Sequence, residues 1–94
     1  MKTVLYLLSA SPHTRTDRFS ILNTAGEGDA VLLHQDAVLG FLPPSPFLEA
    51  LRRRGVRLVA CEPDCRARGV PAPPDAVGWV GFVGLLEEYD LVVS

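Results

Sequence analysis

Apolar residues in this chain gather in short runs, separated by polar turns and by segments with helical spacing. The runs Thr3 to Leu8 and Asp29 to His34 hold apolar residues at successive positions, and Val56 to Ala60 is interrupted only by Arg57. Runs of this length, bounded by turn residues, are typical of strands buried on both faces of a parallel sheet. Each therefore predicts a strand of such a sheet.

Helical patterns occupy the segments between these runs. The segment 14–25 begins with capping-box spacing, has apolar residues on one face, and is expected to end at Gly26. After the second strand, Asp36 is expected to cap a short helical turn over residues 37–39, and Pro43 prevents its continuation. Helices therefore connect the first three strands.

The same alternation continues after Pro43. Ser45 is expected to cap a helix with Pro46 in its first turn, and Gly55 ends that helix. A helix of about two turns over residues 64–68 follows the third strand and ends at Gly69.

The last part of the chain completes the sheet. It predicts a strand over 76–80, a helix over 82–89 and a closing strand over 91–93. Alternating strands and helices favour parallel βαβ units. The expected fold is α/β: a single small domain over residues 1–94, in three layers, with a mostly parallel sheet of about five strands and helices on both faces.

Composition narrows the range of partners and compartments. The chain is 48% apolar and 21% charged, with a net charge of −2, which gives no general attraction for phosphate backbones. Direct binding of nucleic acid is not expected. No apolar run approaches the roughly 20 residues that span a bilayer, and the opening apolar run is shorter than the core of a signal peptide. We expect a cytoplasmic protein without membrane attachment, in which both cysteines are reduced thiols.

Polar and nucleophilic side chains follow each of the first three strands. In an open parallel sheet, ligands bind beyond the carboxyl ends of the strands. If the topology is as predicted, these side chains share that rim, with Gln35, Asp36 and Glu62 as candidate binding residues. The rim residues are Ser9, Ser11, His13, His34, Gln35, Asp36, Cys61 and Glu62.

Cys61 is the candidate nucleophile. It precedes the predicted helix start, where backbone N–H groups and the helix dipole favour a thiolate. Such a thiol could accept a persulfide sulfur; alternatively, Cys61 is a small buried side chain at a strand end. Cys65 lies one helical turn on and is either a packing residue or a resolving thiol.

Metal and cofactor sites are not expected. The spacings of the two cysteines and two histidines match no structural zinc site. The loop from Ser9 to Thr14 has no glycine to cradle a phosphate, so a nucleotide or flavin module is the weakest alternative. His34 and, more weakly, His13 could assist proton transfer, although a histidine at a strand end is often only structural.

The segments GDAVLLHQDAV and FLEALRRRGVRLVACEPDCRARG resemble the DsrH/TusB family of small sulfur-relay proteins. The opening YLLSASP is also similar, and the most specific parts are the Gln35–Asp36 pair and the run 67–69, Ala-Arg-Gly. The resemblance implies a DsrE-like fold and assembly with itself or with sister subunits of the DsrE/DsrF or TusC/TusD kind. It also implies a sulfur donor protein, and a relay toward tRNA wobble 2-thiouridine or in sulfur oxidation.

The resemblance leaves two roles open for the chain. In sister subunits the sulfur-carrying cysteine stands eight residues before the glycine of an Arg-Gly pair, and Cys61 stands in that relation to Gly69. The cysteine that some DsrH proteins have in the first helix is absent here. Cys61 is therefore either a sulfur acceptor, or a cysteine that stands at this position by chance and carries no sulfur, in which case the chain is a non-catalytic assembly subunit. For the assembly role, the tail 91–93 and the corner 41–44 are the candidate contacts.

Overall fold

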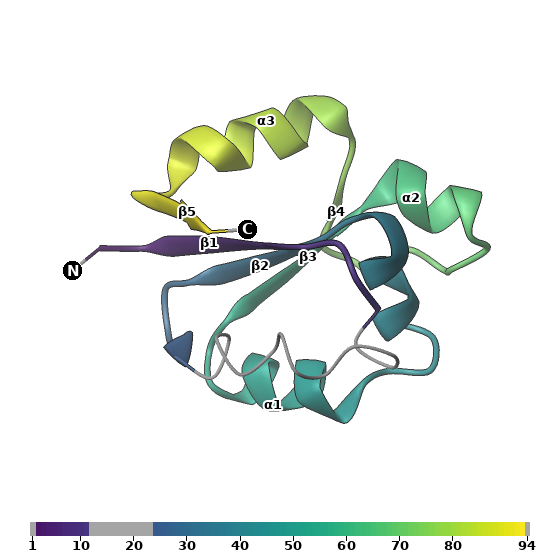
Figure 1. Ribbon diagram of the computed structural model, residues 1–94, viewed down its shortest axis with the longest axis horizontal. Coiled ribbons are helices and arrows are strands. Elements are labelled where there is room, and N and C mark those ends of the chain that lie inside the picture. The colour runs from purple at the N-terminus through teal and green to yellow at the C-terminus, as the bar shows by residue number, and fades with distance from the viewer. Residues whose placement is uncertain (1, 12–23, 94) are drawn as a thin grey trace.

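Five parallel strands form one continuous sheet in the computed structural model, which describes residues 2–11 and 24–93 (Figure 1). The order across the sheet is β4-β3-β2-β1-β5, and every neighbouring pair is parallel. The expected α/β fold with a sheet of about five strands is confirmed. The strands are β1 (Val4–Leu8), β2 (Ala30–Leu33), β3 (Arg57–Cys61), β4 (Ala76–Val77) and β5 (Leu91–Val93).

Helices cover both faces of the sheet, giving the three expected layers. The helix α3 (Trp79–Glu88) packs on one face, and α1 (Pro46–Arg53) lies on the other (Figure 1). Successive residues of a strand point to opposite faces of the sheet. Leu32 packs in the core cluster that contains Leu85 of α3. Leu33 packs in the cluster that contains Leu48 and Leu51 of α1. The strands are therefore apolar at successive positions because they meet protein on both sides.

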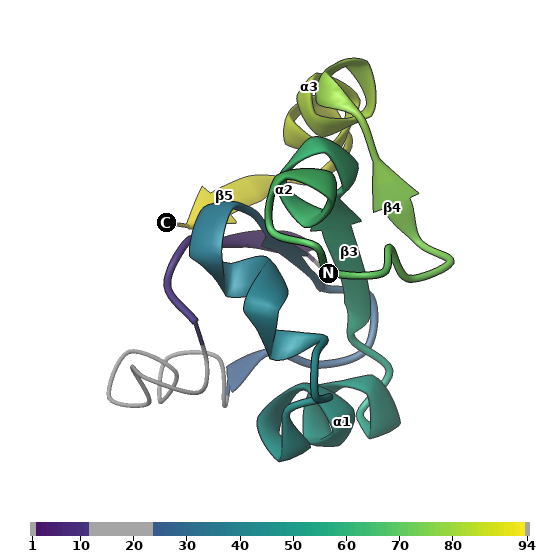
Figure 2. The same cartoon turned by 90° about the vertical axis from the view of Figure 1, so that its right-hand side faces the viewer.

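Two short helices flank the carboxyl ends of β2 and β3. The 3-10 helix η2 (Gln35–Gly40) follows β2, and α2 (Glu62–Ala67) follows β3. They lie side by side (Figure 2). Val38 of η2 and Cys65 of α2 are buried in the same core cluster as the inner face of α1. Sequence-distant segments thus meet at the predicted rim.

Two carboxylates fix the beginning of β1 between its neighbours. Asp29 accepts hydrogen bonds from the backbone N–H of Val4 (2.9 Å) and of Gly26 (3.0 Å), so it ties the turn before β2 to the first residue of β1. Asp90, just before β5, accepts from the N–H of Thr3 (2.9 Å). These bonds set the parallel register at the start of three adjacent strands.

The fourth strand and the last helix differ from the prediction. β4 ends at Val77 instead of Val80, and α3 begins at Trp79 instead of Phe82. Gly78 supplies the N-cap, and its carbonyl accepts the first helical bond, from Phe82 N. The strand predicted over 76–80 is therefore wrong beyond Val77, and Val80, in the first turn of α3, is 89% exposed. The helix predicted over 14–25 lies almost entirely outside the described residues.

Candidate functional site

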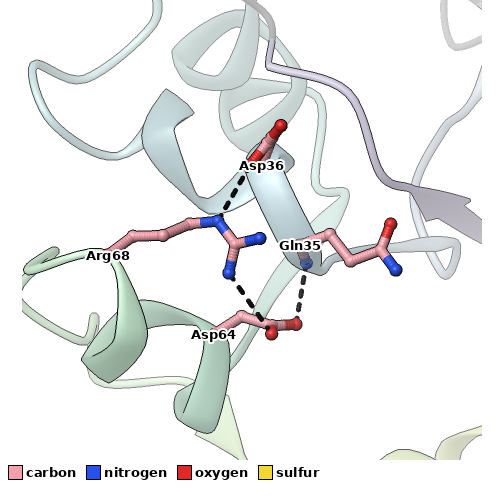
Figure 3. Close-up of polar contacts among 4 residues, drawn as sticks. All are labelled: Gln35, Asp36, Asp64 and Arg68. Carbon is pink, nitrogen blue, oxygen red and sulfur yellow. Dashed lines mark hydrogen bonds and ion pairs between the residues drawn. The ribbon is translucent and has the colours of Figure 1, made fainter.

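A polar cluster joins η2 and α2 at the carboxyl rim of the sheet (Figure 3). The backbone N–H of Gln35 donates to Asp64 Oδ2 at 2.7 Å. Arg68 Nε donates to Asp36 Oδ1 at 2.9 Å, and Arg68 Nη1 lies 3.5 Å from Asp64 Oδ1. We call these four residues the rim cluster. It contains two of the candidate binding residues, Gln35 and Asp36, together with Asp64 and Arg68, and a binding role for any of them stays a prediction.

Asp36 does not cap a helix, so that expectation was wrong. The N-cap of η2 is His34, which makes no side-chain capping bond, and Asp36 lies in the first turn. Its carboxylate instead pairs with Arg68 of α2. The local spacing suggested a cap, but the oppositely charged partner is brought near only by the tertiary fold.

Gln35 has an unusual backbone conformation. Its φ of +51° lies in the left-handed region, which costs a non-glycine residue energy that its surroundings must offset. The charge-assisted bond from its N–H to Asp64 provides such an offset. The side chain of Gln35 points away from the rim cluster and is exposed (Figure 3).

Cys61 lies at the predicted place, at the start of α2. It is the last residue of β3 and the N-cap of α2, and it is fully buried. Burial raises the pKa of Cys61 from an ordinary value of 9.0 to about 11, although a hydrogen bond from the Asp64 backbone acts in the opposite direction. Desolvation therefore outweighs the stabilisation of a thiolate by the helix start, and this environment matches the alternative of a small buried side chain. Whether Cys61 accepts sulfur stays a prediction.

Cys65 is a buried core residue. It is 1% exposed and packs in the same cluster as Val38 and Leu48. Burial raises its pKa, and the carboxylates of Asp64 and Glu62 act in the same direction. The packing interpretation of Cys65 matches this environment, and a role as resolving thiol stays a prediction.

His34 and Glu62 lie next to the rim cluster without belonging to it. The ring of His34 packs edge-on against Phe82 with 5.8 Å between centroids. Burial lowers the pKa of His34, while the nearby Asp64 carboxylate partly raises it. Glu62 pairs with Arg66 on the same helix at 2.6 Å. The remaining rim residues are an exposed Ser9 and a buried Ser11, and His13 lies outside the described residues.

Comparison with known proteins identifies the family. The family described as DsrH like protein matches residues 10–92. The chain belongs to the DsrH family. This confirms the resemblance found in the sequence.

Relatives named Protein TusB match this DsrH-family chain along nearly its whole length. The one from Enterobacter sp. (strain 638) is 35% identical, covering 97% of this chain and 99% of the relative. The one from Serratia proteamaculans (strain 568) is 37% identical, with 92% and 94% covered. The solution structure of protein Tm0979 from Thermotoga maritima has a similar fold, with a TM-score of 0.64, 23% identity, and 90% and 92% of the chains covered.

The rim cluster joins the two separated motifs on which the DsrH resemblance rests. The Gln35–Asp36 pair begins η2, and the Ala-Arg-Gly run ends α2, so the Asp36–Arg68 ion pair connects one motif to the other. Sequence reading noted both motifs but did not pair their charges. Opposite charges within these motifs were the signal that could have suggested the contact.

A groove away from the rim was not anticipated. Its volume is about 470 Å³, and it lies beside the beginning of β3 and the end of α1. The Pro-rich segment before β4 forms one wall. The lining residues are Arg52, Val56, Arg57, Leu58, Pro73, Pro74 and Asp75.

Residues 2–11 and 24–93 contain no group of three metal-ligating side chains close enough to hold an ion. In the same ranges, no helix is both long and apolar enough to cross a bilayer.

Proposed function

We propose that this DsrH-family protein is an assembly subunit of a cytoplasmic sulfur-relay complex. It holds sister subunits of the DsrE/DsrF or TusC/TusD kind in place, and a sulfur donor protein delivers sulfur to the complex. Membership of the DsrH family supports the sulfur relay, and the relatives named TusB favour the branch that leads to tRNA wobble-uridine thiolation. The buried Cys61 with its raised pKa favours assembly over sulfur transfer.

An exposed apolar surface on α3 is the observation that carries this proposal. Trp79, Val80 and Val83 are 59%, 89% and 55% exposed. Neighbouring large apolar side chains left in water mark interaction surfaces in soluble proteins. We call these three residues the α3 surface.

The edge of the sheet offers a second contact. All three residues of β5 are exposed and apolar, and among the described residues β5 pairs only with β1. An apolar edge strand left open would be prone to pair with other chains, so a regular partner would protect it. The predicted tail contact 91–93 is therefore available, as is Leu42 of the predicted corner.

The experiment is co-expression with a sister subunit and measurement of the complex by sedimentation velocity. Val80→Asp places a charge in the α3 surface where the side chain has almost no contacts to lose. It should weaken assembly at least about tenfold, because a buried unpaired charge is costly. Ala50→Asp, on the exposed side of α1, is the matched control and should assemble normally. Equal assembly of both variants would refute a role for the α3 surface, and assembly of the chain only with itself would refute a sister partner.

Sulfur transfer through Cys61 is the second candidate. Its support is the position of Cys61 at the start of α2, where the nearby Asp64 backbone acts to lower the pKa of the thiol. The thiolate would attack the outer sulfur of a donor persulfide. A new S–S bond forms on Cys61, the S–S bond of the donor breaks, and the donor leaves as a thiolate that takes up the proton.

Mass spectrometry after incubation with a persulfide donor separates the two candidates. Gain of one sulfur atom that is absent in Cys61→Ser would support transfer through Cys61. An unmodified native chain at saturating donor would leave only the assembly role.

A further inference from the structure

The short helix α2 depends on the rim cluster for its position. It has only six residues, and Cys61 immediately precedes it. Two side chains of α2 reach across to the beginning of η2: Asp64 binds the N–H of Gln35, and Arg68 binds Asp36. An isolated helix of this length is unstable in water, so these contacts and the buried Cys65 must hold it.

The same contacts stabilise the strained end of β2. Gln35 keeps its left-handed conformation while its N–H is bonded to Asp64. If Asp64 moves away, that N–H loses its charged acceptor and Gln35 can relax to an ordinary conformation. The end of β2 and the start of α2 should therefore open together.

We propose that the rim cluster is a latch that holds α2, the helix whose N-cap is Cys61, against η2, so that Cys61 becomes reactive when the latch opens and α2 lifts from η2. Cys61 is fully buried with the latch closed. Arg68 is the central group, since it contacts Asp36 on one side and Asp64 on the other. Arg68 is 29% exposed in its side chain, so it can be reached from solvent.

The alternative is that Cys61 is inert and reacts only when the whole domain unfolds. The two cases differ in their response to denaturant. Local opening exposes little surface, so the rate of thiol labelling through local opening rises only weakly with urea concentration. If labelling requires global unfolding, its rate rises with urea as steeply as the unfolding equilibrium constant does.

The test is the rate of alkylation of Cys61 by iodoacetamide at low urea concentrations, in a Cys65→Ser background. Rates are divided by those of the urea-unfolded chain at the same pH, which removes the reactivity of the free thiol. The latch predicts a weak urea dependence below the unfolding transition. Arg68→Gln should raise the rate about three- to tenfold, the effect of losing a partly buried ion pair with two acceptors.

Arg66→Gln is the matched control. Arg66 lies on the same helix but, within the part of the chain that the structure describes, pairs only with Glu62 of α2, and its side chain is 75% exposed. Its removal should leave the alkylation rate within about twofold, as expected for an exposed pair. Asp36→Asn breaks the latch from the η2 side and serves if Arg68→Gln does not fold.

The latch is refuted if, in every folded variant, the labelling rate of Cys61 rises with urea as steeply as the equilibrium constant for global unfolding. It is also refuted if Arg66→Gln and Arg68→Gln raise the labelling rate equally. No sulfur donor or sister subunit enters the experiment. Its failure therefore leaves the assembly proposal standing, and failure of assembly leaves the latch testable.

Discussion

Arg68, the C-cap of α2, forms an ion pair with Asp36 in η2, at 2.9 Å and across 32 positions of sequence. The pair connects the segments that follow two adjacent parallel strands, β2 and β3. Both partners also belong to the motifs in which the sequence resembles the DsrH family. The ion pair therefore has a structural role: it holds the end of α2 against η2 at the carboxyl rim of the sheet.

The Asp36–Arg68 pair should couple measurably but weakly. Asp36 is 67% and Arg68 29% exposed in their side chains, so solvent screens part of the attraction. A double-mutant cycle of Asp36→Ala and Arg68→Ala, followed by urea unfolding, should give a coupling free energy of about 0.5–1 kcal/mol. The Glu49–Arg52 pair within α1 is the reference and should couple less. A coupling free energy of zero would mean that the Asp36–Arg68 contact does not contribute to stability.

Asp29 should contribute more to stability than the ion pair. Its carboxylate accepts two backbone N–H bonds at the starts of β1 and β2, and it is partly buried. Asp29→Ala leaves both donors without their acceptor and should lower the free energy of unfolding by about 2–4 kcal/mol. Asp90→Ala, which removes the corresponding bond at the exposed start of β5, should cost less. Urea unfolding measures both, and equal losses would contradict the role given to Asp29.

The strands could be predicted from the sequence, because burial on both faces leaves an uninterrupted apolar run. The same rule failed at Trp79 and Val80, which are apolar yet exposed: the pattern does not distinguish a strand within a core from a helix with an apolar outer surface. The role of Asp36 was missed because its partner is distant in sequence. The two alternatives for Cys61, an activated thiol or a small buried side chain, could not be separated from the sequence, because burial is a tertiary property.

Stability should fall at alkaline pH because of Cys61. Its pKa is about 11 in the folded protein and 9.0 ordinarily, so between these values the unfolded chain loses a proton that the folded chain keeps. The contribution of the protonated Cys61 thiol to the free energy of unfolding is complete below pH 9. It is lost as the pH rises toward 11, and the free energy of unfolding then falls by about 2–3 kcal/mol for a pKa shift of this size.

Urea unfolding at a series of pH values from 7 to 10.5 would measure this loss. Cys61→Ala should flatten the alkaline decline, whatever its effect on stability at neutral pH. Cys65→Ala should flatten it too, since burial also raises the pKa of Cys65. An unchanged decline in both variants would show that these thiols ionise freely in the folded state.

Acid should destabilise the protein through His34. Burial against Phe82 lowers the pKa of the imidazole below 6.5, so in mildly acidic solution the unfolded chain binds a proton that the folded chain resists. The stabilisation is present above pH 6.5 and is lost as the pH falls through the folded-state pKa. His34→Gln should therefore make stability less sensitive to pH between about 7 and 5.

The Asp64 carboxylate allows a second test, because it changes the pKa of His34 in the direction opposite to burial. It is the group that raises the pKa of His34 against the effect of burial. Asp64→Asn should therefore lower the pKa of His34 further, as measured by NMR titration of the imidazole protons. Arg66→Gln, on the outer side of the same helix, should leave it unchanged. A titration midpoint at or above 6.5 in the native protein would contradict the burial of the ring, and an upward shift in Asp64→Asn would contradict the proximity of the carboxylate.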